Sequence, residues 1–280
     1  MLSVLSGLLV ALNRRFINYV GNDFETVTHS YRGKFTVFIN SKYLIERQIF
    51  IDNYEPQNVE LMSSIVSPGD VVFDVGANVG AITLPLAESV GPTGQVHSFE
   101  PGIPIFDRLV KNIRQNPSVS GRIFPNHVGI SEKEGELIWR EFAHMPGNAR
   151  FHEPNGNWTP SSSYRVPVTT LDAYVARNDL QHVDLIKVDT EGFEPMVLAG
   201  ARQTLKKFRP VFLVETLQEY QEMPGTAYFL LIEDSMRTVD YALFKFNGRL
   251  STASPENHSQ DTLCIPVEKI SEIATRIDHR

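Results

Sequence analysis

The chain has 280 residues, of which 42% are hydrophobic and 21% are charged, as in an ordinary soluble globular protein. Its formal net charge of −7 leaves no basic surplus to neutralise phosphates, which excludes nucleic acid as the main partner. Cys264 is the only cysteine, so no intrachain disulfide forms, and we expect a reducing, cytoplasmic location.

The start of the chain combines an apolar segment with a β-rich region. Residues 2–12 are apolar but shorter than the roughly 20 residues that span a bilayer. We expect no transmembrane segment there. A helix that packs on the domain or on a partner is predicted, with weak peripheral membrane contact as the alternative. Residues 35–39 and 43–45 are predicted to form a hairpin or two short strands. Residues 1–53 are thus expected to be an extension packed on a core domain of residues 54–280.

The core is predicted to begin with a helix over residues 55–66 and a strand from Val71 that runs into Asp74. A glycine turn, Gly76 to Gly80, leads from this strand into a helix, as in a nucleotide-binding βαβ unit. Asn78 replaces the second glycine of the dinucleotide fingerprint, and the lysine of a P-loop is absent, so the turn disfavours a diphosphate. An acid at the strand end suits an ammonium group and favours S-adenosylmethionine. An ordinary strand–turn–helix corner is the alternative.

The rest of the chain alternates strand and helix patterns, which predicts an α/β fold of the Rossmann-like class with a doubly wound, mainly parallel sheet. We predict strands over residues 95–100, 122–128, 136–142, 166–171, 184–189, 209–215, 241–246 and 262–267, and helices over 81–90, 106–113, 171–175, 195–208 and 226–239. Residues 143–163 are rich in Pro, Gly, Asn and Ser and include Phe151 and Trp158, so we predict a substrate lid there.

Four acids, Asp74, Glu100, Asp189 and Glu215, stand where predicted parallel strands end. The ends of such strands share one edge of the sheet, which is where ligands bind. Acids gathered there repel one another unless a cation, a proton or a positively charged ligand is present. Glu100 also follows the glycine turn at about the spacing of the carboxylate that binds ribose hydroxyls in nucleotide folds.

The chain resembles the FkbM family of S-adenosylmethionine-dependent methyltransferases, which have the class I Rossmann-like fold. The similarity extends over about residues 54–215 and rests on the motifs at residues 73–80, 98–101, 170–172, 186–194 and 209–210. It implies that Asp74, Gly76, Ala77, Asn78 and Gly80 hold the amino-acid part of the cofactor. Glu100 and Pro101 are expected at the ribose, Ile130 and Ser131 at the adenine, and Asp189 also at the cofactor.

The resemblance implies O-methylation of a hydroxyl on a sugar, a glycan or a secondary metabolite. An alcohol needs a base or a metal to take up its proton. We expect Asp189, with Glu191, Glu194 or Glu215, to act as the base. Alternatively, Asp189 and Glu215 bind a divalent cation such as Mg²⁺.

Lys187 is two residues before Asp189 and therefore points to the same face of the strand. It either orients Asp189 or, with a lowered pKa, acts as the base itself. No histidine is preferred as a base, and His127 is the one to test.

Two other functions remain open from the residues. One is a non-catalytic module that binds an adenosine ligand or a protein partner, which the acids at Asp189 and Glu215 disfavour. The other is a nicotinamide-dependent dehydrogenase, which Asn78 disfavours. No pattern in the sequence indicates an oligomeric state.

Overall fold

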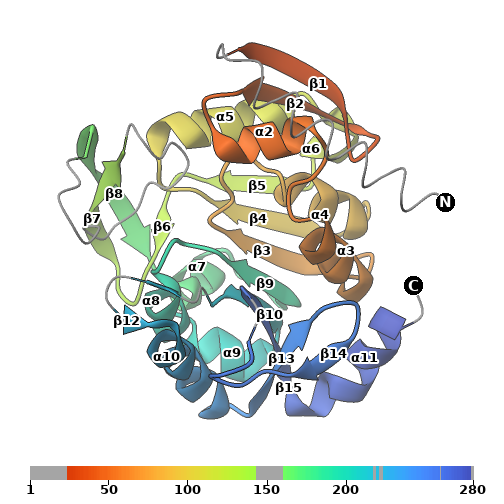
Figure 1. Ribbon diagram of the computed structural model, residues 1–280, viewed down its shortest axis with the longest axis vertical. Coiled ribbons are helices and arrows are strands. Elements are labelled where there is room, and N and C mark those ends of the chain that lie inside the picture. The colour runs from red at the N-terminus through yellow and green to blue at the C-terminus, as the bar shows by residue number, and fades with distance from the viewer. Residues whose placement is uncertain (1–23, 143–159, 217–218, 221–222, 259, 279–280) are drawn as a thin grey trace.

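An eight-stranded sheet runs through the computed structural model, which describes residues 24–142, 160–216, 219–220, 223–258 and 260–278 (Figure 1). From edge to edge its strands are β14 (Leu250–Thr252), β13 (Tyr241–Phe246), β15 (Asp261–Pro266), β10 (Val211–Glu215), β9 (Leu185–Val188), β3 (Val71–Val75), β4 (Gln95–Phe99) and β5 (Ile123–Asn126). The strands from β10 to β5 pair in parallel, and β15, β13 and β14 pair antiparallel. The predicted α/β class with a mainly parallel sheet is confirmed.

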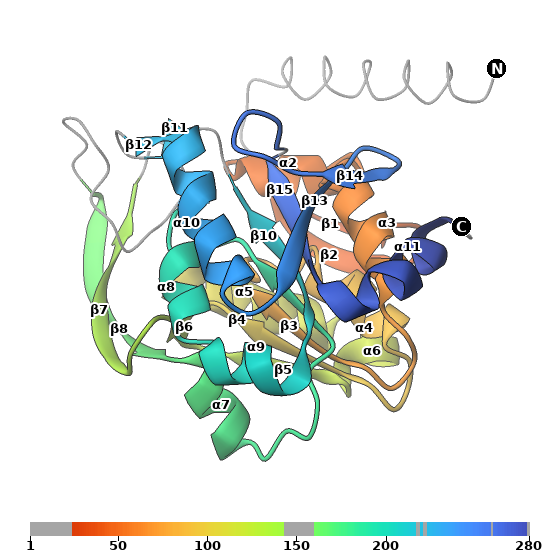
Figure 2. The same cartoon turned by 90° about the horizontal axis from the view of Figure 1, so that it is seen from below.

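Helices cover both faces of this sheet (Figures 1 and 2). One layer consists of α3 (Pro56–Ile65), α4 (Thr83–Ser89), α5 (Ile103–Arg114), α6 (Pro117–Ser120) and α11 (Ile270–Asp278), and the other of α7 (Leu171–Arg177), α8 (Glu194–Ala199), α9 (Arg202–Phe208) and α10 (Gly225–Arg237). Successive side chains of a strand point to opposite faces. In β10, Val211 and Leu213 therefore pack with the first layer, and Phe212 and Val214 with the second.

The described N-terminal part differs from its prediction. The strands β1 (Glu25–Tyr31) and β2 (Phe35–Asn40) pair antiparallel, but residues 43–45 do not continue as a strand. They lead into the helix α2 (Leu44–Phe50). Ile45 and Ile49 are four residues apart, so they share one face of this helix, and Ile49 is buried. The predicted helix over residues 2–12 lies outside the described residues.

Two further sheets are small. The strands β7 (Gly135–Glu141), β8 (Ser162–Thr169) and β6 (Gly129–Ile130) form one, and β11 (Glu219–Tyr220) and β12 (Met223–Pro224) form the other. The predicted strands near residues 136–142 and 166–171 therefore exist but leave the main sheet. The end of the predicted lid, residues 162–163, belongs to β8, and residues 143–159 lie outside the described residues.

The C-terminal part adds α11 and β14, which the sequence patterns did not predict, and a short 3-10 turn, Val267–Lys269. None of the helices in the described ranges is long and apolar enough to cross a membrane.

The helix predicted over residues 195–208 is two helices, α8 and α9, which meet at Gly200. A Cβ atom at Gly200 would lie 2.1 Å from the carbonyl oxygen of Ser131. The backbone just after β6 therefore lies directly against the backbone of Gly200. This close approach, which no periodicity reveals, is the reason for a glycine at the junction.

The turn after β3 touches the segment after β9. Gly76 has a φ of +81°, and a Cβ atom on it would lie 1.8 Å from the carbonyl oxygen of Asp189. The chain leaves β3 toward β4 on one side, while β9 lies on the other, so this is the point where the strand order reverses. Ligands bind at such a point in open α/β sheets.

Gly76→Ala is expected to destabilise the protein more than Gly33→Ala. Gly33, in the turn between β1 and β2, also has a positive φ (+69°), but no atom of another described residue comes within 4 Å of its Cβ position, apart from its chain neighbours. Both changes cost about 1–2 kcal/mol for the left-handed backbone, and Gly76→Ala costs about 1–3 kcal/mol more for overpacking. Denaturant unfolding measures both, and equal losses would contradict the contact with Asp189.

Candidate active site

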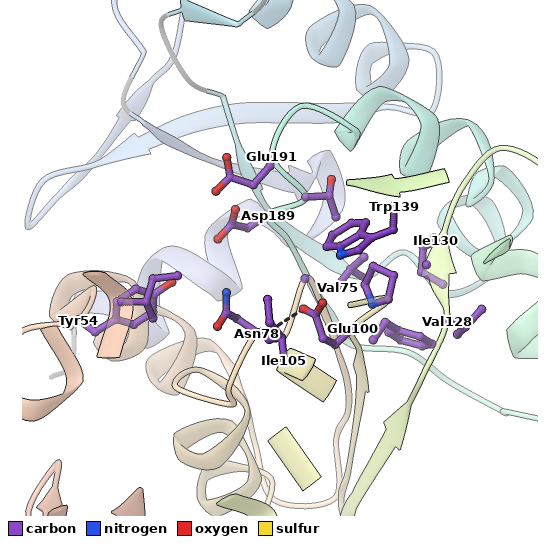
Figure 3. Close-up of a pocket in the computed structure, with 16 residues that line it drawn as sticks. Tyr54, Val75, Asn78, Glu100, Ile105, Val128, Ile130, Trp139, Asp189 and Glu191 are labelled. Carbon is purple, nitrogen blue, oxygen red and sulfur yellow. Dashed lines mark hydrogen bonds between the residues drawn. The ribbon is translucent and has the colours of Figure 1, made fainter. Parts of the chain in front are cut away.

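A cavity opens at the ends of β3, β4 and β9, at the switch point of the sheet (Figure 3). Of the residues predicted to bind the cofactor, those that line it are Gly76, Asn78, Glu100, Pro101, Ile130 and Asp189. Glu191 and Thr190 line it from the segment after β9. Other lining residues were not predicted as part of a site, among them Ile45 and Tyr54, Val128 after β5, and Trp139 on β7. Of these residues, only Trp139 could have been identified from the sequence, because it is a large apolar side chain in a strand of alternating polar and apolar residues.

Lys187 lies behind this cavity as a buried cation, with 4% of its surface exposed. Its Nζ atom is 3.2 Å from Asp189 Oδ2 and 3.6 Å from Asp74 Oδ1, and it donates to the carbonyl oxygen of Gly76 at 3.3 Å. Burial by itself lowers the pKa of Lys187, but the carboxylates of Asp189, Asp74 and Glu55 raise it by more, to above its ordinary value. Lys187 thus stays charged. The suggested role as a base needs a lowered pKa, which these carboxylates oppose, whereas the role of orienting Asp189 fits the geometry.

Asp74 does not line the cavity. Its side chain is fully buried, where it accepts from the Thr83 hydroxyl at 2.6 Å and pairs with Lys187. Burial raises the pKa of Asp74, and the Lys187 ammonium and the Thr83 hydroxyl offset part of that rise. Asp74 was expected to contact the ammonium group of a ligand, but in the structure it contacts the ammonium group of Lys187 instead. Ala77, Gly80 and Ser131 are likewise absent from the residues that line the cavity.

Glu100 faces the cavity from the end of β4. Its two oxygens accept from the backbone N–H of Asn78 at 3.0 Å (the dashed line in Figure 3) and of Gly102 at 2.8 Å. Burial raises its pKa to about 7, and the two N–H groups offset part of that rise. A carboxylate has about four lone-pair positions, so two remain for hydroxyl groups of a ligand.

The far end of the cavity is apolar. Val128, Ile130 and Trp139 lie on one side of Glu100 in Figure 3, and Asp189 and Glu191 on the other. His127 is next to this end, but it stacks on Phe106, and its Nε2 atom is 3.0 Å from the carbonyl oxygen of Pro101. These contacts give His127 a structural role.

Oxygen atoms of Asp189, Glu194 and Glu215 lie within 4.8 Å of one another. Glu194 is already saturated, because it accepts from Thr190 N at 2.6 Å, from the Thr190 hydroxyl at 2.9 Å and from the Tyr228 hydroxyl. Burial and then the charge of Asp189 raise the pKa of Glu215 to about 11, so Glu215 carries a proton at neutral pH. Of this group only Asp189 is partly exposed, with 20% of its side chain accessible.

The cavity suits a ligand that is apolar and flat at one end and positively charged at the other. The apolar side chains fit an adenine base, Glu100 fits ribose hydroxyls, and Asp189 with Glu191 fits a sulfonium and an ammonium group. No lysine or arginine lines the cavity among the described residues, so nothing there favours a diphosphate.

The family profile described as "Methyltransferase FkbM domain" matches residues 74–243. The chain is 26% identical over 187 residues to the "2-O-methyltransferase NoeI" of Sinorhizobium fredii. The alignment covers 58% of this chain and 70% of that relative. It is 29% identical over 154 residues to the "Hexuronic acid methyltransferase AglP" of Haloferax volcanii, with coverages of 54% and 58%. It is 30% identical over 181 residues to the "31-O-demethyl-FK506 methyltransferase FkbM" of Streptomyces tacrolimicus, with coverages of 55% and 66%.

Asp74→Ala is expected to lower the free energy of unfolding by about 3–5 kcal/mol, because it leaves the buried Lys187 with half of its carboxylate partners. Glu88→Ala is the control. It breaks an exposed pair with Lys34 and should cost at most about 1 kcal/mol. Denaturant unfolding at pH 7 measures both variants. A cost for Asp74→Ala as small as the control's would show that the buried pair does not hold the site together.

Proposed function

The chain belongs to the FkbM methyltransferase family and is an S-adenosylmethionine-dependent enzyme, and from this premise we propose that it methylates a hydroxyl oxygen of a sugar, a glycan or a secondary metabolite. The cavity at the switch point carries the proposal, with Glu100 between an apolar end and an acidic end. The names of the three relatives support it, since each is a methyltransferase and two of the names specify transfer to oxygen. We also propose a cytoplasmic location, which the single, buried Cys264 supports.

When it is bound, S-adenosylmethionine supplies a methyl group on a positively charged sulfur. The chain's own residues bind and orient it. Val128, Ile130 and Trp139 enclose the base, and Glu100 accepts from the ribose hydroxyls. The N–H of Asn78 already holds Glu100 in place, so its carboxylate needs little rearrangement. The acids of the segment after β9 stabilise the positive charge.

Asp189 is the base that the geometry favours. Lys187 pairs with one carboxylate oxygen of Asp189, and the Asp189 side chain is partly exposed at the cavity. S-adenosylmethionine would supply the methyl group to the acceptor oxygen and would retain the electron pair of the broken bond on its sulfur, with Asp189 beside the acceptor hydroxyl. The hydroxyl proton passes to Asp189. Much of the rate gain then comes from holding the acceptor in line with the methyl group.

A divalent cation such as Mg²⁺ at Asp189 and Glu215 is the second way to activate the hydroxyl. Both side chains offer hard oxygen ligands within one cluster. Glu194 is excluded as a ligand by its saturated hydrogen bonds. The cation would have to displace the proton of Glu215.

Binding of the demethylated cofactor, S-adenosylhomocysteine, is expected to weaken as the pH falls below about 7. Glu100 has a raised pKa of about 7, so its charge is present above that pH and is lost below it. At pH 6 the affinity should be about tenfold lower than at pH 8. Titration calorimetry with 5′-methylthioadenosine, which lacks the amino-acid part, should show the same dependence. The matched variant Glu100→Gln should bind weakly at every pH. If the wild-type protein bound neither ligand, the proposed function would be abandoned.

Asp189→Asn is expected to lower kcat for methyl transfer by about 10²–10⁴-fold, the usual contribution of a general base. Glu215→Gln keeps the shape and the neutral charge of protonated Glu215, so it should retain activity within about threefold. Mass spectrometry of acceptor products measures both, with S-adenosylhomocysteine binding as the check on folding. Activity that is lost on chelation, and restored by Mg²⁺ only when Glu215 is intact, would replace the protein base by the metal.

A further inference from the structure

A second cavity adjoins the first and has no part in the cofactor site described above. Its floor is formed by Leu213 of β10 and Leu263 of β15, which face each other in the sheet. Glu55, Asn58, Phe246, Gln260 and Asp261 form its walls. It lies on the face of the sheet that α3 covers, because Leu213 and Leu263 pack with that layer.

The second cavity lies close to Asp189. Asp261, which lines it, pairs in register with Glu215, and carboxylate oxygens of Glu215 and Asp189 lie within 4.8 Å of each other. Tyr54 lines the first cavity and the next residue, Glu55, lines the second. The charge of Asp189 acts on both cavities, since it contributes to raising the pKa of Glu55. In Figure 3, Tyr54 lies on the same side of Glu100 as Asp189 and Glu191.

The walls carry the groups that bind hydroxyls. Asn58 Nδ2 donates to Asp261 Oδ2 at 2.8 Å and to Glu55 Oε2 at 3.2 Å, which holds the two carboxyl groups side by side.

Gln260 Nε2 donates to Glu215 Oε1 at 3.2 Å. Glu215 is 7% exposed, and its Oε2 atom has no hydrogen bond among the described residues. Strand alternation puts Glu215 on the same face of the sheet as Leu213, and Gln260, which lines the cavity, is its hydrogen-bond partner. Carboxyl and amide groups together accept from and donate to neighbouring hydroxyls, and Phe246 offers a ring to the apolar side of a sugar.

The walls are acidic. No lysine or arginine is among the described lining residues, and the cation that acts on Glu55 and Asp261 is Lys187, which is shared with Asp74 and Asp189. Burial, and then the charge of Glu55, raises the pKa of Asp261 to about 7. A ligand that carried a carboxylate or a phosphate would repel these acids or require a further proton to be taken up, and either effect costs free energy in a partly buried setting.

The second cavity comes almost entirely from segments that the family profile does not match. Of its ten lining residues, five precede residue 74 and four follow residue 243, which leaves Leu213 within the matched range. In the first cavity only Ile45 and Tyr54 fall outside that range. The first cavity therefore lies mostly within the matched range, and the second is built mostly by segments outside it.

We propose that the second cavity is the acceptor site and that it takes a neutral sugar ring or an equivalent neutral polyol, held by Glu55, Asn58, Gln260 and Asp261 with one hydroxyl at Asp189. This proposal rests on the proposed function. It implies that uronic acids and sugar phosphates are rejected. The acceptor class of this chain thus differs from the hexuronic acid in the name of one of its relatives.

The test uses the full chain loaded with S-adenosylhomocysteine and a panel of methyl glycosides. Saturation-transfer NMR compares the neutral glucoside, galactoside and mannoside with the matching glucuronide, galacturonide and mannuronide. We expect at least one neutral glycoside to bind about tenfold or more tightly than its uronide. The double variant Glu55→Gln, Asp261→Asn should reduce this preference to less than threefold and weaken neutral binding.

Glu60→Gln is the matched control, because Glu60 is an exposed acid on the same helix, α3, and does not line the cavity. It should leave both measurements unchanged. Equal or tighter binding of uronides, no binding of any neutral glycoside, or no effect of the double variant would each overturn the proposal. If S-adenosylhomocysteine binding were unchanged in that case, only the acceptor-site proposal would fail, and the proposed methyltransferase function would still hold.

Discussion

The buried ammonium of Lys187 is the interaction on which the rest of the site depends. A charge that is 4% exposed needs partners, and it finds them in Asp74 on β3, Asp189 after β9 and the carbonyl oxygen of Gly76. These three groups belong to the two strands at the switch point and to the turns that follow them. Because the ion pairs fix both turns against each other, the glycine at position 76 has no room for a side chain. One cation thus sets the shape of the cofactor cavity and the direction of the Asp189 carboxylate.

The acids at the sheet edge tolerate one another because the chain itself neutralises part of their charge. Lys187 supplies a cation, and Glu215, with its pKa raised to about 11, keeps a proton. Glu194 is compensated by hydrogen bonds from Thr190 and Tyr228, which tie the segment after β9 to α10. Three carboxylates, Glu100, Asp189 and Glu191, remain at the cavity surface. In the proposed function the first accepts from neutral hydroxyls and the other two face positive charge.

The sequence was sufficient for the parallel core but not for what surrounds it. Continuous apolar runs that end in acids predicted strands such as β3 and β10, and the motif residues Asn78, Glu100 and Asp189 do line one cavity. The role of Asp74 was missed because its partner, Lys187, is directly opposite in the register of two strands that are far apart in the chain. The helix α2 was predicted as a strand because a seven-residue segment shows too few turns to reveal its period. The second cavity joins Asn58 to Asp261 across 203 positions, a distance over which no local pattern gives information.

In the function that we propose, Asp189 links the cofactor cavity to the acceptor cavity. The methyl group would move from a cationic sulfur on one side to a neutral oxygen on the other, and Asp189 would take up the proton released between them. Other acids, which include Glu55 and Glu191, lie near this base. The ammonium of Lys187, 3.2 Å from Asp189 Oδ2, holds the carboxylate in its orientation. In this proposal the same carboxylates attract the sulfonium of the cofactor and repel an anionic acceptor. Cofactor binding and acceptor selection would therefore depend on the same acidic residues.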